Sequence, residues 1–112
     1  MHSYLFANTP RGYYDRSMIT DIKKRASHRS KIIEGQFKGL QKMIDAEEYC
    51  IDILTQSLAI QKSLSSLNKL ILENHLRTCA EQKLSSKQPE VKSEAIKELL
   101  HLYELSNIRA TK

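Results

Sequence analysis

The segment from Tyr49 to Lys83 contains neither proline nor glycine, and this constrains the fold more than any other feature of the sequence. Its apolar residues give it more than one apolar face: Ile51, Leu54, Leu58, Leu64, Leu67, Ile71, Leu72 and Leu76. A helix of this length in a small protein normally needs a partner along most of its length. The segment therefore predicts one long helix, from about Tyr49 to Lys83, that packs against other helices.

Two shorter helices are predicted on either side of this segment. The first runs from about Thr20 to Ile44, with Thr20 as its N-cap. Its apolar residues form a stripe on one face: Ile22, Ala26, Ile33, Phe37, Leu40 and Ile44. Gly35 and Gly39 interrupt it, and because a helical glycine costs about 1 kcal/mol, we expect a close helix contact there. The other helix runs from about Pro89 to Leu105.

The composition predicts one small helical domain that depends on further copies of itself. Of 112 residues, two are phenylalanine and none is tryptophan, so the core of a monomer would be thin and an oligomer is expected. We expect a flexible N-terminal tail over residues 1–17 and the helical domain over residues 18–108. No apolar run approaches the length of a membrane span, and no secretion signal is evident. Two cysteines without a disulfide framework fit a reducing, cytoplasmic location.

Positive charge is concentrated in the N-terminal part of the chain. Residues 1–44 carry nine Lys or Arg against three Asp or Glu, or +6, whereas residues 45–112 carry nine against ten, or −1. The basic residues singled out on the first helix are Lys24, Arg25, Arg29, Lys31, Lys38 and Lys42, and the three lysines 24, 31 and 38 recur every seven residues. Acidic partners four residues away are nearly absent, which favours a phosphate-binding surface over an ordinary solvated helix.

Cys50, His75 and Cys79 are the candidate metal ligands. His75 and Cys79 are four residues apart, which puts them on one face of a helix. The 25 steps from Cys50 to His75 return the chain to roughly 20° from its starting direction, but they rise roughly 37 Å. Cys50 therefore cannot share a ligand with His75 and Cys79 of its own chain. A second, antiparallel copy related by a two-fold axis near Leu64 could supply its Cys50.

Two thiolates and one imidazole form a set of soft ligands with a low coordination number. Such a set favours Cu(I), and Zn(II) would need a fourth ligand. The sequence has no CxxC or HExxH motif. It also has no Ser/His/Asp set, phosphate loop or close pair of carboxylates, so it does not predict an enzyme. The alternative from the residues alone is that these three side chains only pack.

Several short stretches resemble the copper-sensing operon repressor (CsoR) family. They are residues 28–40 (HRSKIIEGQFKGL), Met43–Ile44, Tyr49–Cys50, Asn74–Leu76 and Cys79. The resemblance covers about residues 18–105, and the Cys…His-x-x-x-Cys spacing is its most specific part. This family includes related nickel/cobalt, formaldehyde and persulfide sensors.

The resemblance implies an all-α fold. The protomer would have three helices with a long central helix, and antiparallel dimers would assemble into a disc-like tetramer. It also implies a transcriptional repressor that is not an enzyme, binds operator DNA without metal and is released by Cu(I). Its partners would be operator DNA and further copies of the chain, in a homodimer or homotetramer. It would not bind a membrane.

The resemblance also assigns roles to individual residues. The Cu(I) ligands would be Cys50 of one chain and His75 and Cys79 of its partner. Tyr49 and Glu98 would lie in the shell of residues around these ligands. Arg29 and Lys31 would lie on the helix that contacts DNA. Ser66 stands where some members carry a further basic residue, so the exact DNA footprint is not carried over from the resemblance.

The choice of inducer within this family depends on few residues. Nickel/cobalt members add a histidine where Met18 stands here and replace the last cysteine, which this chain keeps as Cys79. Formaldehyde sensors lack that cysteine, and persulfide sensors lack the histidine, so His75 favours copper. The alternatives are a thiol-based sensor of persulfide or another electrophile, a nickel-responsive repressor that uses His2, and a copper-buffering helical protein without a DNA role.

Overall fold

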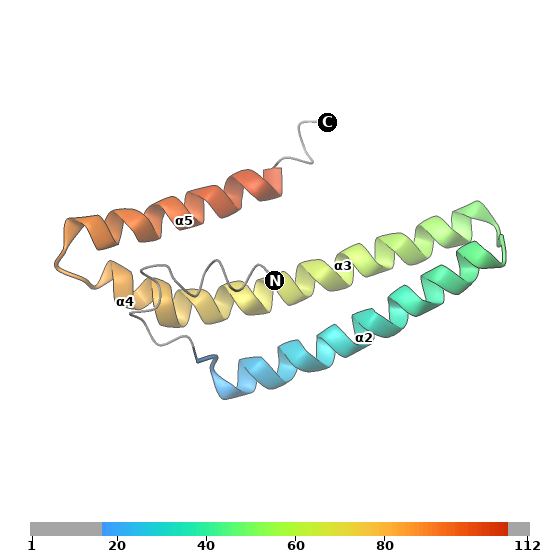
Figure 1. The fold of residues 1–112 in the computed structure, drawn as a ribbon, viewed down its shortest axis with the longest axis horizontal. Helices are drawn as coiled ribbons and strands as arrows, with labels where there is room; N and C mark the ends of the chain where they lie inside the picture. The colour runs from blue at the N-terminus through green and yellow to red at the C-terminus, as the bar shows by residue number, and fades with distance from the viewer. Residues whose placement is uncertain (1–16, 108–112) are drawn as a thin grey trace. The chain divides into compact units, whose positions relative to one another are not determined.

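The structure is a computed structural model that describes residues 17–107, and all of their regular elements are helical. The elements are α2 (Thr20–Asp45), α3 (Cys50–His75), the π-helical segment η2 (Leu76–Ala80), α4 (Glu81–Leu84) and α5 (Pro89–Asn107) (Figure 1). The predicted all-α protomer with a long central helix is confirmed. The predicted tail lies outside the described residues except for Ser17, and the predicted extent of the domain, residues 18–108, stays a prediction.

The chain divides into two compact units, one of which is Met18–Asn74. In this unit α2 and α3 run antiparallel, side by side (Figure 1). Its core cluster consists of Ile22, Ala26 and Leu70, covered by Met18, Ile19 and Leu67. Burial of Ile22 and of Leu70 contributes about 1.5–3 kcal/mol each. Ile22, Ala26 and Ile33 of the predicted stripe are buried, whereas Phe37 and Ile44 are about half exposed.

The start of α2 differs from the prediction. Thr20 is the first helical residue, and the N-cap position belongs to Ile19, which makes no side-chain capping hydrogen bond. The N–H of Ile19 instead donates to Oδ1 of Asn74 at 2.9 Å, and the carbonyl of Ile19 accepts the N–H of Lys23. The predicted Thr20 cap is therefore wrong, because a side chain 55 positions away satisfies the entering backbone.

The end of α2 is a Schellman motif. The N–H of Glu48 donates to the carbonyl of Met43, and the N–H of Glu47 donates to the carbonyl of Ile44. Glu47 has a φ of 52°, the left-handed conformation that such a motif requires and that glycine usually adopts. The carbonyl of Tyr49 then accepts the N–H groups of residues 52 and 53, so α3 begins at Cys50.

The two glycines of α2 do not behave alike. A Cβ built on Gly39 would lie 3.6 Å from Nε2 of Gln56, an ordinary van der Waals distance. That Nε2 donates to the main-chain carbonyl of Gln36 at 3.1 Å, which ties α3 to α2. A Cβ on Gly35 would meet nothing within 4 Å. The expected close helix contact is therefore wrong at Gly35 for a single chain, and at Gly39 it is a side-chain contact.

The described part of the other unit includes residues 75–107. The helical run from α3 continues through η2 into α4, turns at residues 85–88 and returns as α5, which packs on α4. The prediction of one α-helix to Lys83 is wrong over Leu76–Ala80, because these residues form a π-helix with i→i+5 bonding. Over residues 75–107, the buried residues of this unit are Ala80, Lys83 and Ala95. Over the described residues, no helix is both long and apolar enough to cross a membrane.

Candidate metal site and nucleic-acid interface

Cys50 is an exposed thiol at the first residue of α3, in the Met18–Asn74 unit. The side chain of Tyr49, which precedes it, is 70% exposed. Neither Cys50 nor Cys79 is in a disulfide. Because the backbone carbonyl of Tyr49 forms the first turn of α3, it fixes where the Cys50 side chain leaves the helix. Cys50 is thus presented to the surroundings of the chain at a rigid helix end.

His75 and Cys79 belong to the other unit. His75 is the last residue of α3, and Cys79 lies within η2, where both residues are partly buried. A π turn holds more residues than an α turn, so the angle between these two side chains differs from that of an unbroken α-helix. π-helical turns occur frequently at functional sites. The segment between the two predicted ligands is therefore the irregular part of the helical run.

The structure brings Glu98 to His75. Nε2 of His75 lies 3.9 Å from Oε1 of Glu98, and the two side chains are 31% and 24% exposed. The distance exceeds that of a hydrogen bond, so the two groups form a loose pair. Of the two residues predicted to lie around the metal ligands, Glu98 lies beside a predicted ligand, His75. Tyr49, in contrast, is 70% exposed.

The same carboxylate oxygen also contacts Lys83, which the sequence analysis did not single out. The ammonium of Lys83 donates to Oε1 of Glu98 at 3.1 Å and to Oε1 of Glu94. Lys83 has no exposed surface. Desolvation lowers the pKa of Lys83, but hydrogen bonds and opposite charges from Glu94 and Glu98 outweigh it, so that its pKa is raised. The sequence feature that could have indicated this contact is the i, i+4 spacing of Glu94 and Glu98, which puts two carboxylates on one face of a helix.

Within residues 17–107 of one chain, no three His, Cys, Asp or Glu side chains are placed to hold a metal ion. The predicted set of Cys50, His75 and Cys79 stays a proposal. Its chemistry fits the predicted metal, because two thiols and an imidazole are the soft donors that Cu(I) prefers.

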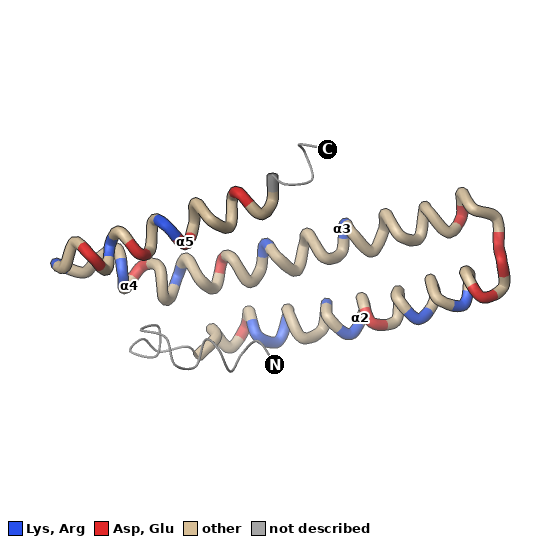
Figure 2. The backbone as a smooth tube through the Cα atoms, turned by 45° about the horizontal axis from the view of Figure 1, so that its top comes forward, with Lys and Arg blue, Asp and Glu red and all other residues tan. Residues whose placement is uncertain are grey.

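The predicted DNA-binding residues are all exposed on α2: Lys24, Arg25, Arg29, Lys31, Lys38 and Lys42. Figure 2 shows basic residues along α2 and acidic residues around the connection to α3. Arg25 forms an ion pair with Asp21 at 3.6 Å, which is one turn away. The surface that could meet phosphates is thus built on a single rigid element.

These basic side chains form two rows. At 100° per residue, Lys24, Lys31, Lys38 and Lys42 fall within roughly 40° of one another, opposite the buried Ile22 and Ile33. This set is called the lysine row. Arg25 and Arg29 lie roughly 100° or more around the helix from Lys24. The lysine row is therefore the side of α2 that points farthest from its core.

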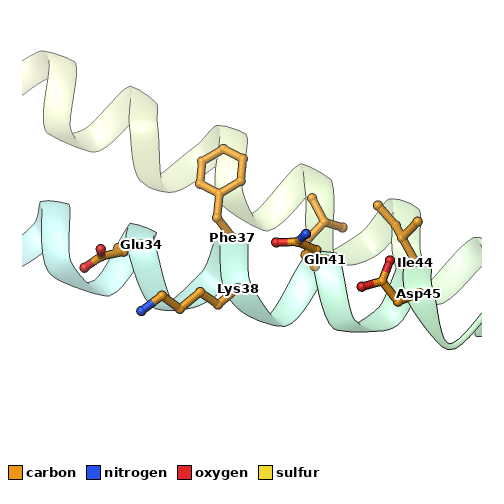
Figure 3. Close-up of a pocket in the computed structure, with 7 residues that line it drawn as sticks. Glu34, Phe37, Lys38, Gln41, Ile44 and Asp45 are labelled. Carbon is orange, nitrogen blue, oxygen red and sulfur yellow. The ribbon is translucent and has the colours of Figure 1, made fainter.

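An open groove runs along the C-terminal half of α2. It is lined by Glu34, Phe37, Lys38, Leu40, Gln41, Ile44 and Asp45, six of which are labelled in Figure 3. Phe37 and Ile44 supply its exposed apolar surface, while Lys38 and Asp45 supply charge. The groove is a helix face rather than an enclosed cavity, so it resembles a contact surface more than a small-molecule site.

Comparisons with known proteins agree on one family. Copper-sensing transcriptional repressor CsoR of Mycobacterium ulcerans is 39% identical over 61 residues, which cover 54% of this chain and 52% of that protein. CsoR of Bacillus subtilis is 36% identical over 81 residues, covering 72% and 77%. The chain thus spans about half the length of the mycobacterial relative and three quarters of the Bacillus one.

Solved structures give the same result. The Cu(I)-bound copper-sensing repressor CsoR of Geobacillus thermodenitrificans matches with a TM-score of 0.71 and 29% identity, over 82% of this chain and 93% of that chain. A variant of the formaldehyde-responsive regulator FrmR of Salmonella enterica serovar Typhimurium matches with a TM-score of 0.63 and 27% identity, over 81% and 98%. Because residues 22–104 also match the family described as metal-sensitive transcriptional repressors, which are not enzymes, this chain belongs to that family.

Proposed function

We propose that this chain is a Cu(I)-responsive transcriptional repressor. It binds operator DNA without metal and leaves the DNA when Cu(I) occupies a site made by Cys50 of one protomer and His75 and Cys79 of its partner. The single observation that carries the proposal is the length of α3, which begins at Cys50 and ends at His75. A helix of 26 residues rises roughly 37 Å between these ends, so the ligand set requires two chains.

The surface of α3 supports an antiparallel dimer. Ile51, Leu54 and Leu58 are each more than half exposed. Helical periodicity puts them roughly opposite Ile60 and Leu70, which are buried on the side of α2. Exposed apolar surface of this kind marks a protein contact. With the two-fold axis near Leu64, the start of each α3 would lie beside the end of its partner.

The groove on α2 offers a second contact surface. Its apolar side chains, Phe37 and Ile44, are 50% and 53% exposed in a single chain. Two separate apolar surfaces, one on α3 and one on α2, are what a dimer needs in order to assemble into the proposed tetramer. Lys38 of the lysine row lines this groove, whereas Lys24, Lys31 and Lys42 would stay outside both contacts, available to DNA.

Metal and DNA would communicate through residues that this chain positions. Bound to one nitrogen of His75, Cu(I) would supply a cation that keeps the other nitrogen as an N–H donor. Nε2–H of His75 would then donate to Oε1 of Glu98, closing the present 3.9 Å separation. Since Glu98 belongs to α5, this contact would fix α5 against the end of α3. By linkage, DNA would weaken Cu(I) binding by the same factor, typically 5–150-fold.

Operator binding would depend on charge. The exposed lysines and arginines of α2 would contact phosphates, so affinity would fall steeply with salt. Few base-edge contacts are needed if the sequence preference comes from DNA shape. Such a role would place the protein in the cytoplasm with the chromosome.

An anaerobic titration tests this proposal. The chain is bound to the DNA upstream of its own gene at moderate salt, and Cu(I), Ni(II), Zn(II) and polysulfide are added in separate arms. The proposal expects release by Cu(I) at about one equivalent per chain and no release by the other three. Release by polysulfide alone would make this a thiol-based sensor, and release by Ni(II) alone a nickel sensor. Failure to bind the DNA would leave a copper-buffering protein.

A further inference from the structure

Lys83 is the one buried lysine among residues 17–107, and every other lysine in that range is exposed. It lies in α4 with no accessible surface. Lysine is rarely buried fully, because removing an ammonium from water is expensive unless it is paired and hydrogen-bonded. The position of Lys83 therefore calls for a structural reason.

Two carboxylates from α5 surround this ammonium. Nζ of Lys83 donates to Oε1 of Glu94 and, at 3.1 Å, to Oε1 of Glu98. The two glutamates are four residues apart on α5, so they face α4 together. A carboxylate oxygen offers two lone pairs, so Oε1 of Glu98 can accept from Lys83 and from a second donor.

His75 is positioned to be that donor. Its Nε2 lies 3.9 Å from Oε1 of Glu98, the same oxygen that Lys83 contacts. A glutamate side chain has three rotatable torsions, and an exposed one would move among many rotamers. Here the buried ammonium lies 3.1 Å from Oε1 of that carboxylate, which restricts its rotamers. Lys83 thus helps to set where the oxygen that faces the imidazole lies.

We propose that Lys83 is a positioning residue for the metal response, because it holds the Glu98 carboxylate where Nε2–H of His75 can reach it. This role rests on the proposed function and extends it to a residue that is neither a proposed ligand nor a proposed DNA contact. Lys83 would have little influence on how tightly Cu(I) binds. It would determine how much of that binding is transmitted from His75 to α5. The raised pKa of Lys83 supports the assignment, since the group stays cationic across the physiological range.

The test is a double-mutant cycle on the full chain with the variants Lys83→Met, Glu98→Gln and their combination. Lys92→Met is the matched control, because Lys92 is an exposed lysine on α5. Three quantities are measured for each variant. They are the operator affinity without metal, the Cu(I) affinity by competition with a chelator, and the ratio of operator affinities without and with Cu(I). Circular dichroism and sedimentation check the fold and the assembly.

The proposal expects Lys83→Met to keep the metal-free operator affinity and the Cu(I) affinity within about threefold. The ratio of operator affinities, about 5–150 in coupled systems, should fall toward 1. The combined variant should be no worse than Glu98→Gln alone, since both changes remove one interaction. Lys83→Arg should restore part of the ratio, and Lys92→Met should change nothing.

Other outcomes overturn the proposal. An unchanged ratio in Lys83→Met, or additive losses in the combined variant, would mean that Lys83 only packs α4 against α5. If Lys83→Met does not fold, Lys83→Gln decides. Its shorter, neutral side chain cannot hold the Glu98 carboxylate as the ammonium does, so the ratio should fall severalfold, whereas an unchanged ratio contradicts the role. If Cu(I) does not release the unsubstituted protein from DNA, the proposed function itself fails. If Cu(I) releases the unsubstituted protein and Lys83→Met equally, only the role of Lys83 fails.

Discussion

Nε2 of His75 lies 3.9 Å from Oε1 of Glu98, which joins the last residue of α3 to the middle of α5. One of these side chains is a predicted metal ligand, and the other belongs to α5, which the proposed contact would fix against the end of α3. At 3.9 Å the two atoms are too far apart for a hydrogen bond. A change at the imidazole of His75 would therefore reach α5 through this pair of side chains.

Glu98→Gln should uncouple metal from DNA. The carboxamide keeps the shape of the side chain but lacks the charge that attracts the imidazole N–H. Removing such a partner typically costs about 10–100-fold in metal affinity, so Cu(I) should still bind. Release of operator DNA by saturating Cu(I) should be largely lost in a fluorescence anisotropy titration. Glu104→Gln, at an exposed position of α5, is the control, and normal release in Glu98→Gln would disprove the relay.

The two basic rows of α2 can be distinguished by salt. Lys31→Ala removes one member of the lysine row and should lower the slope of log affinity against log salt by about 0.9. Arg29→Ala makes the same test for the other row. Lys92→Ala on α5 removes one charge from a different element and should leave the slope unchanged. If neither α2 variant alters operator affinity, the DNA surface lies elsewhere.

Gly35→Ala should stabilise the protein. A Cβ there meets nothing within 4 Å, and alanine is more favourable than glycine inside a helix by about 1 kcal/mol. For a chain of this size we expect the midpoint of thermal unfolding, measured without DNA, to rise by about 4–8 °C. A lower midpoint would show that another copy of the chain packs against this position in the assembly.

The buried Lys83 predicts a specific pH dependence of stability. Its pKa in the folded chain is raised above the ordinary value of 10.5. The ion pairs with Glu94 and Glu98 therefore stabilise the fold fully below pH 10.5, and this contribution is lost as the pH rises through the folded pKa. Urea unfolding of the wild type should show a steeper loss above pH 10.5 than that of Lys83→Met. Parallel curves for the two proteins would contradict the raised pKa.

Much of the fold could be predicted because its signals are local. Glycine and proline are absent from Tyr49 to Lys83, and the polar residues before Pro89 end that run. The first and last helices, and the helical run from α3 through η2 to α4 taken as a whole, consequently begin and end within two residues of the predicted bounds. Predicted core residues such as Ile22 and Ala26 are buried because their spacing follows the helical period.

The remaining features depend on contacts between distant residues. The start of α2 is set by Asn74, which is 55 positions away, so no local rule could replace Thr20 as the cap. The π turn at Leu76–Ala80 has no signal in the apolar spacing. Lys83 was treated as an ordinary helix end, because lysine is normally exposed and its two partners belong to another helix. The proposed metal site would require a second chain, which a single sequence does not place.

Mixed assemblies of two variants test the central claim most directly. Cys50→Ala and Cys79→Ala each destroy every proposed site when present alone, so neither protein should bind Cu(I) tightly in a chelator competition. In a mixed antiparallel dimer, the intact Cys50 of the second variant meets the intact His75 and Cys79 of the first. Co-refolding the two variants should therefore restore tight Cu(I) binding that neither shows by itself. If the mixture binds no better than its parents, the ligands do not come from two chains and the account is wrong.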